Sequence, residues 1–181
     1  MYLETDRLTI RSMELSDEKA YIEMASDGSL DEDIFSGYQG GYSRWIPEWI
    51  KESILLDKKD NPKNNYLSYT IVEKKRSVPI GSVGCSYYED LEQVGLVYFI
   101  GAKYRGNGYA TEAINAYTKY FLEEYNIPKI VATIRAANID SWKVAEKAGF
   151  VLVETKMYQD YGDAVEKLYH FYEMTKEKFT R

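Results

Sequence analysis

The stretch that decides the fold is YFIGAKYRGNGYATEAINAY, residues 98–117. Its first residues, up to Ile100, are typical of a β-strand, and those after Gly108 place apolar side chains at helical spacing. Gly106 and Gly108 are separated by one residue at the junction. The first amides of a helix have no partner inside the helix, and glycines let an anion approach the backbone closely. The stretch therefore predicts a phosphate site formed by the amides of residues 105–111.

Two common nucleotide-binding motifs are excluded by the residues around the glycine pair. A dinucleotide-binding fingerprint requires G-x-G-x-x-G/A, but its third position here is Thr111. That fingerprint also opens a βαβ unit, whereas several antiparallel-looking strands precede this junction. A phosphate-binding P-loop needs G-K-[ST], which does not occur here. The glycine pair alone is therefore compatible with a phosphate site or with an ordinary turn.

The apolar periodicity of the chain predicts one domain, residues 1–181, of mixed α/β class. The predicted strands are residues 7–13, 66–74, 79–88, 93–100, 129–135, 150–159 and 167–176, and the predicted helices are residues 17–26, 43–58, 108–125 and 139–148. Pro47 is expected in the first turn of its helix, where proline is tolerated. Three strands in a meander precede the glycine junction and a crossover helix follows it. This order predicts a mixed, mostly antiparallel sheet of about seven strands with helices on both faces.

Composition excludes several classes of site. The chain has one cysteine, Cys85, and one histidine, His170, so we expect no intrachain disulfide, no metal site of the His/Cys type and no Ser-His-Asp triad. The net charge of −6 argues against a nucleic-acid partner, and it suits either a cationic partner or simple solubility. Charged residues begin the chain, and no apolar run reaches about 18 residues. We therefore expect a cytoplasmic location without a membrane segment.

Three blocks of the sequence resemble one enzyme superfamily. RGNGYATEA, residues 105–113, resembles the acetyl-CoA pyrophosphate loop of the GNAT N-acetyltransferases, in the form typical of their ribosomal-protein N-terminal acetyltransferase branch. TDRLTIRSM, residues 5–13, is similar to the opening strand of that branch. ANIDSWKVAEKAGF, residues 137–150, resembles its second hallmark. The resemblance covers nearly the whole chain and is weakest over residues 27–65.

The resemblance implies a three-layer fold and acetyl-CoA as cosubstrate. In this family two neighbouring parallel strands, here residues 94–101 and 129–135, splay apart in a V, and the pantetheine arm lies between them. Gly95 fits a bulge that opens the splay, or a glycine required by close packing. A strand N–H at this place would polarise the thioester carbonyl. The implied cofactor-binding residues are Tyr98, Phe99, Ile100, Arg105, Gly106, Asn107, Gly108, Tyr109, Ala110, Thr111, Asn138 and Ser141.

Ser141 is the candidate general acid. Asn138 is predicted to cap the helix that follows it, and the resemblance directs its side chain toward the pantetheine. The resemblance also places Ser141 near the cofactor sulfur, where its hydroxyl would protonate the leaving thiolate; the alternative is a first-turn serine bonded to local backbone. Many family members carry a tyrosine four residues further on, at the position of Ala145 here.

The general base is left open by the sequence. The branch often has a glutamate two residues before the strand glycine, where this chain has Gln93. Glu92 is adjacent but, by strand alternation, points to the other face. Glu112, in the first turn of its helix, is a second candidate or else stabilises the helix dipole. A water relay, or an acceptor that arrives deprotonated, would serve without either carboxylate.

These observations lead to one predicted function and two rivals. The prediction is acetyl transfer from acetyl-CoA to a protein N-terminus or a small amine, such as a polyamine or an aminoglycoside, by direct attack in a ternary complex of a monomer or homodimer. The rivals are a non-catalytic acyl-CoA-binding module and a protein that binds another nucleotide. The acceptor pocket is expected from residues 27–58 and from the closing hairpin, residues 150–159 and 167–176. Within residues 27–58, aromatic and acidic side chains would form it or simply pack the helix and its loop. These side chains are Tyr38, Tyr42, Trp45, Trp49, Asp31, Glu32 and Asp33.

Overall fold

The computed structural model describes residues 1–30, 41–160 and 162–179. In these ranges the strands are β1 (Tyr2–Glu4), β2 (Leu8–Ser12), β3 (Leu67–Glu73), β4 (Val78–Tyr88), β5 (Gln93–Ile100), β6 (Lys129–Arg135), β7 (Val151–Tyr158) and β8 (Lys167–Thr175). The α-helices there are α1 (Glu18–Ala25), α2 (Tyr42–Lys59), α3 (Tyr109–Glu124) and α4 (Ile139–Lys147). The predicted elements are all present, with boundaries shifted by a few residues at most.

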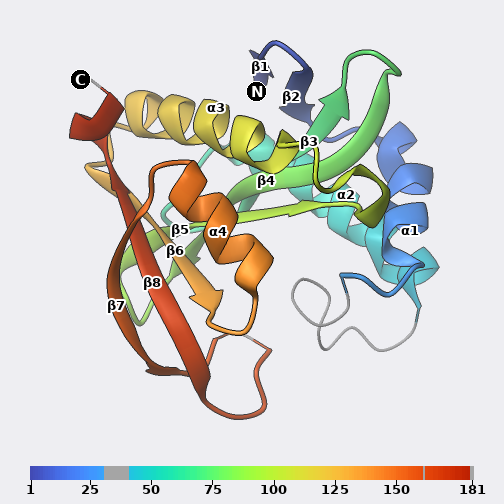
Figure 1. The fold of residues 1–181 in the computed structure, drawn as a ribbon. Coiled ribbons are helices and arrows are strands. Elements are labelled where there is room, and N and C mark those ends of the chain that lie inside the picture. The colour runs from blue at the N-terminus through green and yellow to red at the C-terminus, as the bar shows by residue number, and fades with distance from the viewer. Residues whose placement is uncertain (31–40, 161, 180–181) are drawn as a thin grey trace.

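The strands form one sheet in the order β1-β2-β3-β4-β5-β6-β8-β7. Every neighbouring pair is antiparallel except β5 and β6, which run parallel. These two strands pair only at Gly95 and Val131 and then diverge, as Figure 1 shows. The mixed sheet with a V-shaped splay is therefore confirmed. We call the point at Gly95 and Val131 the fork.

Eight strands are described where about seven were predicted. The additional strand, β1, has three residues and pairs with β2 at the edge of the sheet. A segment this short contains too few positions for an alternating pattern to emerge from the sequence.

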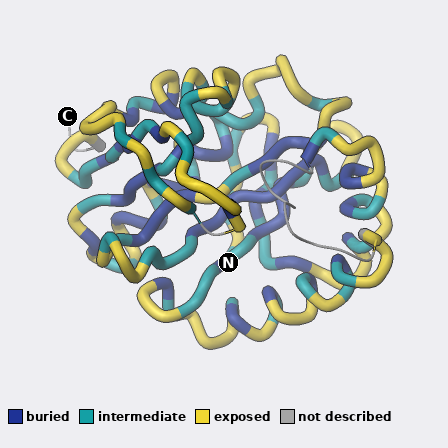
Figure 2. Tube along the Cα trace, turned by 90° about the horizontal axis from the view of Figure 1, so that it is seen from below, coloured by how far each residue is buried: buried dark blue, intermediate teal, exposed yellow. Residues whose placement is uncertain are grey.

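Helices cover both faces of the sheet (Figure 1). On one face α3 inserts its fully buried Ile114, Tyr117 and Phe121 into a core shared with β2, β3 and β4, and α4 adds Ala145. On the other face, which we call the α1/α2 face, Tyr21 of α1 and Ile50 of α2 pack with residues that include Phe99 of β5. Figure 2 shows the result, with buried segments in the middle and exposed turns at the rim. The three-layer arrangement is thus confirmed.

Pro47 differs from its predicted position. Helix α2 begins at Tyr42, so Pro47 lies in the second turn. Its missing N–H removes a hydrogen bond to the carbonyl of Ser43. Because Ser43 is exposed, water can solvate that carbonyl. The helix is retained because Ile46 and Ile50 are fully buried on the same side.

Candidate active site

Position 95, at the fork, requires glycine because a side chain there would collide with Tyr88. A Cβ added at Gly95 would lie 2.3 Å from the Tyr88 ring, which therefore lies directly against the strand backbone. The Tyr88 hydroxyl accepts a hydrogen bond from Oγ1 of Thr133 on β6, at 3.0 Å. The ladder between β4 and β5 shows no register shift at Gly95. Of the two explanations for this glycine, the structure therefore supports close packing.

Beyond the fork, none of the other described strands pairs with the backbone edge of β5 that faces β6, and we call this the open edge. The amide of Gly101 donates to the carbonyl of Ile80 at 2.9 Å, which sets the alternation of the antiparallel ladder with β4. By that alternation Phe99 directs its backbone groups to β4, whereas Tyr98 and Ile100 direct theirs into the splay. The carbonyl of Ile100 accepts from Nε of Arg105 at 2.9 Å, so the open edge continues into the glycine junction.

In the glycine loop, residues 105–108, the carbonyls of Arg105 and Asn107 accept hydrogen bonds from side chains. Nδ2 of Asn107 donates to the carbonyls of Tyr104 and Arg105, at 3.1 and 3.0 Å. Nη1 of Arg7 donates to the carbonyl of Asn107 at 2.8 Å. The N–H of a trans peptide points opposite to its C=O. The amides of Gly106 and Gly108 are therefore directed away from these hydrogen bonds.

The N-terminus of α3 offers the hydrogen-bond donors that an anion needs. Gly106 and Gly108 have φ of 76° and 77°, a left-handed conformation that favours glycine. No side chain caps α3, and within the described residues the amides of residues 106–111 donate no hydrogen bond. A Cβ at Gly106 would meet nothing within 4 Å. Backbone conformation, more than crowding, therefore explains why the loop contains glycine.

The second predicted block also contributes to this region. Oδ1 of Asn138 accepts from the amide of Ser141 at 3.1 Å, which caps α4 as predicted. The Tyr98 hydroxyl lies 2.8 Å from both Oγ and the carbonyl oxygen of Ser141, so the serine hydroxyl is held against β5. Burial raises the pKa of Tyr98 to about 12, so the phenol stays protonated. Ala145, one turn further along α4, is fully buried.

The candidate carboxylates lie in different surroundings. Glu92 is exposed in the turn between β4 and β5, with φ of 51°, three residues before the fork. Its role as a base stays a prediction. Glu112 accepts hydrogen bonds from the Thr5 hydroxyl at 2.6 Å and from the amide and Nε of Arg7, at 3.0 and 2.6 Å. Glu112 is thus hydrogen-bonded to the N-terminal segment.

A polar cluster on the α1/α2 face of the fork was not predicted. Oγ1 of Thr133, which contacts Tyr88, also lies 3.3 Å from Oδ2 of Asp160. Nearby, the buried Asp163 accepts from Arg135 Nη2 at 2.6 Å and from the Tyr169 hydroxyl at 2.7 Å. Nζ of Lys167 also lies 2.9 Å from Oδ1 of Asp163. Burial favours a higher pKa for Asp163, but the hydrogen bonds from Tyr169 and Lys167 and the charge of Arg135 lower it.

Part of the predicted acceptor pocket lies on the same face. Trp49 packs against Tyr21, with ring centres 5.1 Å apart, and against Phe99 of β5, at 6.4 Å. Trp45 packs against Trp49 at 6.1 Å. Tyr38, Asp31, Glu32 and Asp33 lie outside the described residues, as does the side chain of Tyr42.

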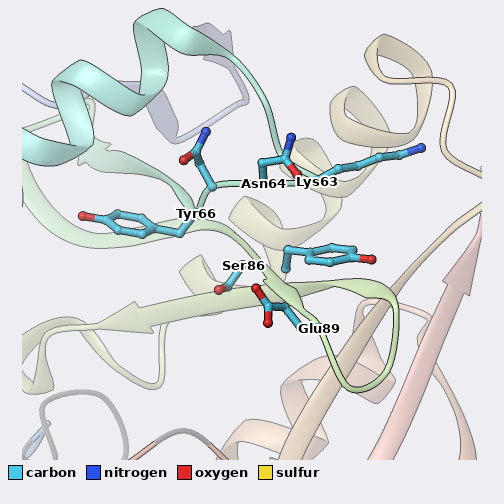
Figure 3. A pocket seen from close by; sticks show the side chains of 7 residues that line it. Lys63, Asn64, Tyr66, Ser86 and Glu89 are labelled. Carbon is cyan, nitrogen blue, oxygen red and sulfur yellow. The ribbon is translucent and has the colours of Figure 1, made fainter.

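A separate hollow of about 220 Å³ lies where β4 extends beyond the start of β3 (Figure 3). Lys63 and Asn64 line one side of it, and Ser86 and Glu89 line the other. The predicted site residues do not line this hollow, so it is distinct from the splay.

The comparisons with known proteins agree with this geometry. The family model described as "Acetyltransferase (GNAT) domain" matches residues 7–151, so the chain belongs to the GNAT acetyltransferase family. It is 28% identical over 153 residues to an uncharacterized N-acetyltransferase, YnaD, of Bacillus subtilis (strain 168), covering 82% of each chain.

Solved structures share the fold. A GNAT-family acetyltransferase from Bacillus anthracis has a TM-score of 0.80 at 21% identity, covering 98% of this chain and 99% of that one. RimL, a ribosomal L7/L12 α-N-protein acetyltransferase in complex with coenzyme A, has a TM-score of 0.78 at 14% identity, covering 97% and 98%. At these identities the two likenesses show the shared fold.

The described ranges were also compared with the requirements of a metal site and of a membrane-spanning helix. There, His, Cys, Asp and Glu side chains do not gather in groups of three or more that could hold a metal ion. None of the helices described is both long and apolar enough to cross a membrane.

Proposed function

We propose that the chain is an N-acetyltransferase that transfers the acetyl group of acetyl-CoA to a primary amine by direct attack in a ternary complex. The open edge of β5 carries the proposal. At one end Ile100 contacts Arg105 of the glycine loop, and further back Tyr98 contacts Ser141. One edge thus joins an anion site suited to pyrophosphate with a hydroxyl suited to a departing thiolate. Membership of the family supports acetyl-CoA as donor.

Different residues near this edge would bind different parts of the cofactor. The amides of residues 106–111 would bind the pyrophosphate, and the backbone of Tyr98 and Ile100 would pair with the pantetheine amides. One strand N–H would polarise the thioester carbonyl as negative charge develops on its oxygen. Ser141 would protonate the leaving thiolate, while Asn138 fixes the helix turn that carries it. Phe99, whose backbone faces β4, would act through packing on the other face.

The amine would approach from the α1/α2 face, and two carboxylates close to the fork are candidates for the base. Asp160 lies at the fork, in contact with Thr133. Glu92 lies in the turn before β5. We propose Asp160 as the group that accepts the amine proton, directly or through water, because it is at the point where β5 and β6 diverge. A protein N-terminus, a polyamine or an aminoglycoside would fit as acceptor. Cytoplasmic location and a monomeric or homodimeric state stay predictions.

The test is release of free thiol from acetyl-CoA against a panel of primary amines. The panel would contain peptides with free N-termini, polyamines and aminoglycosides, with an N-terminally blocked peptide as control. We expect thiol release that depends on both the protein and a free amine, with a product heavier by one acetyl group. A folded protein that binds acetyl-CoA but turns over no member of the panel would favour the alternative function.

That alternative is a non-catalytic acyl-CoA-binding module. Gln93 and the fully buried Ala145 favour it, because neither can supply the proton transfers that the family usually makes at these positions. Ser141→Ala separates the two functions. It would lower turnover in an enzyme, whereas in a binding module it would change only affinity.

A further inference from the structure

Arg7 joins the N-terminal segment to the glycine loop, 100 residues further along the chain. Its Nη1 donates to the carbonyl of Asn107 at 2.8 Å. Its Nε and Nη2 each lie 2.6 Å from Oε2 of Glu112. The guanidinium also covers the ring of Tyr109, at 4.8 Å from the ring centre. One side chain thus contacts the loop, the first residue of α3 and the first turn of that helix.

Glu112 fixes the position of this arginine. While Oε2 accepts from the guanidinium, Oε1 accepts from the Thr5 hydroxyl at 2.6 Å and from the Arg7 amide at 3.0 Å. Burial tends to raise the pKa of Glu112, but the hydrogen bonds from Thr5 and Arg7 outweigh it and lower the pKa. Glu112 is therefore ionised at neutral pH, and it neutralises Arg7. We call Thr5, Arg7 and Glu112 the clamp.

We propose that Arg7 is a positioning residue that sets the affinity of the glycine loop for the pyrophosphate of coenzyme A, an inference that rests on the proposed function of this loop. The peptide between Asn107 and Gly108 can adopt more than one orientation, because glycine is free to rotate. When Arg7 holds the Asn107 carbonyl, the Gly108 amide points away from the clamp. In the flipped orientation the carbonyl would face the anion and repel it.

This role differs from simple attraction of phosphate by a positive charge. The charge of Arg7 is balanced by Glu112, and each of its three guanidinium nitrogens already contacts Glu112 or Asn107. Lysine at position 7 would keep the charge, but it cannot donate to Glu112 and Asn107 in the same fork-like geometry. The proposal therefore predicts that Arg7→Lys weakens binding nearly as much as Arg7→Gln. A purely electrostatic role predicts that lysine restores it.

The experiment is calorimetric titration of the full chain with coenzyme A, for the wild type and for Arg7→Lys, Arg7→Gln and Glu112→Gln. Lys74→Gln is the matched control, because Lys74 donates to the Thr5 carbonyl at 2.7 Å and thus holds the same segment without touching the loop. We expect each clamp variant to raise the Kd about tenfold, the value of one charged hydrogen bond, and Lys74→Gln to leave it unchanged. With a responsive amine, kcat at saturating acetyl-CoA should stay near the wild-type value while KM for acetyl-CoA rises.

Three results would overturn the proposal. They are wild-type affinity in folded Arg7→Gln, affinity restored by Arg7→Lys, and an equal loss in Lys74→Gln. If Arg7→Gln does not fold, Glu112→Gln decides, because it keeps the side-chain shape but removes the charge and one of the two oxygens that accept from Arg7 and Thr5. A wild-type chain that does not bind coenzyme A would contradict the proposed function itself.

Discussion

The glycine loop and the polar cluster at the fork are built in different ways. The loop presents backbone amides from consecutive residues, and the nearby side chains of Asn107 and Arg7 are turned to its carbonyls. The cluster presents side chains from separate elements, among them Tyr88 of β4, Thr133 of β6 and Asp160 after β7. The loop suits a constant ligand such as pyrophosphate. The cluster, whose shape depends on individual side chains, suits a ligand that differs between relatives.

The largest expected effect comes from the backbone of the loop. Gly108→Val should abolish the stabilisation by coenzyme A, because valine strongly disfavours the φ of 77° that orients the loop amides. Thermal unfolding with and without coenzyme A measures it. Gly41→Val is the matched control, since Gly41 has φ of 88° and open space around it but lies outside the loop. That variant should lose stability and keep its response to coenzyme A. An unchanged response in Gly108→Val would refute the anion site.

The next largest effect concerns the cluster. Asp160→Asn should lower kcat by about 10²- to 10⁴-fold, the usual contribution of a general base, and leave the affinity for acetyl-CoA unchanged. Glu92→Gln is the control and should retain most activity. The reverse result would identify Glu92 as the base.

The same contrast explains what the sequence could predict. Local patterns of strand, turn and helix contain Gly106, Gly108, Asn138 and Ser141. Such patterns can be recognised from the sequence alone. The Asp160 site depends on β6 and on the β7–β8 connection meeting at the fork, a contact that the spacing of residues does not encode. Tyr88 is one of 18 tyrosines and has no distinguishing neighbour in the sequence. The edge strand β1 was missed because three residues carry no periodicity.

A smaller effect is expected where β5 meets α4. Tyr98→Phe removes the hydroxyl that lies 2.8 Å from Ser141 Oγ and keeps the ring. We expect kcat to fall about three- to tenfold, the value of one hydrogen bond, because the serine loses its fixed orientation. In the background of Ser141→Ala the same substitution should change little. Tyr172→Phe is the matched control, since its hydroxyl donates to Glu146 on α4 at 3.0 Å and does not touch Ser141. Equal losses in both tyrosine variants would indicate a general loosening of α4.

The smallest effect is a dependence of stability on pH, in which the loop and the cluster should behave alike. Glu112 beside the loop and Asp163 in the cluster both have a folded-state pKa below the ordinary value, because hydrogen bonds and cations outweigh the cost of burial. Each ionised carboxylate therefore stabilises the fold above its unfolded pKa, and this contribution is lost as the pH falls through the folded-state pKa. Urea unfolding between about pH 6 and pH 3 measures the slope, and the ordinary pKa values near 4 set that range. Glu112→Gln and Asp163→Asn should each reduce the slope. If only Asp163→Asn does so, the clamp contributes orientation to the loop without stabilising the fold, and the two regions differ in energetics as well as in construction.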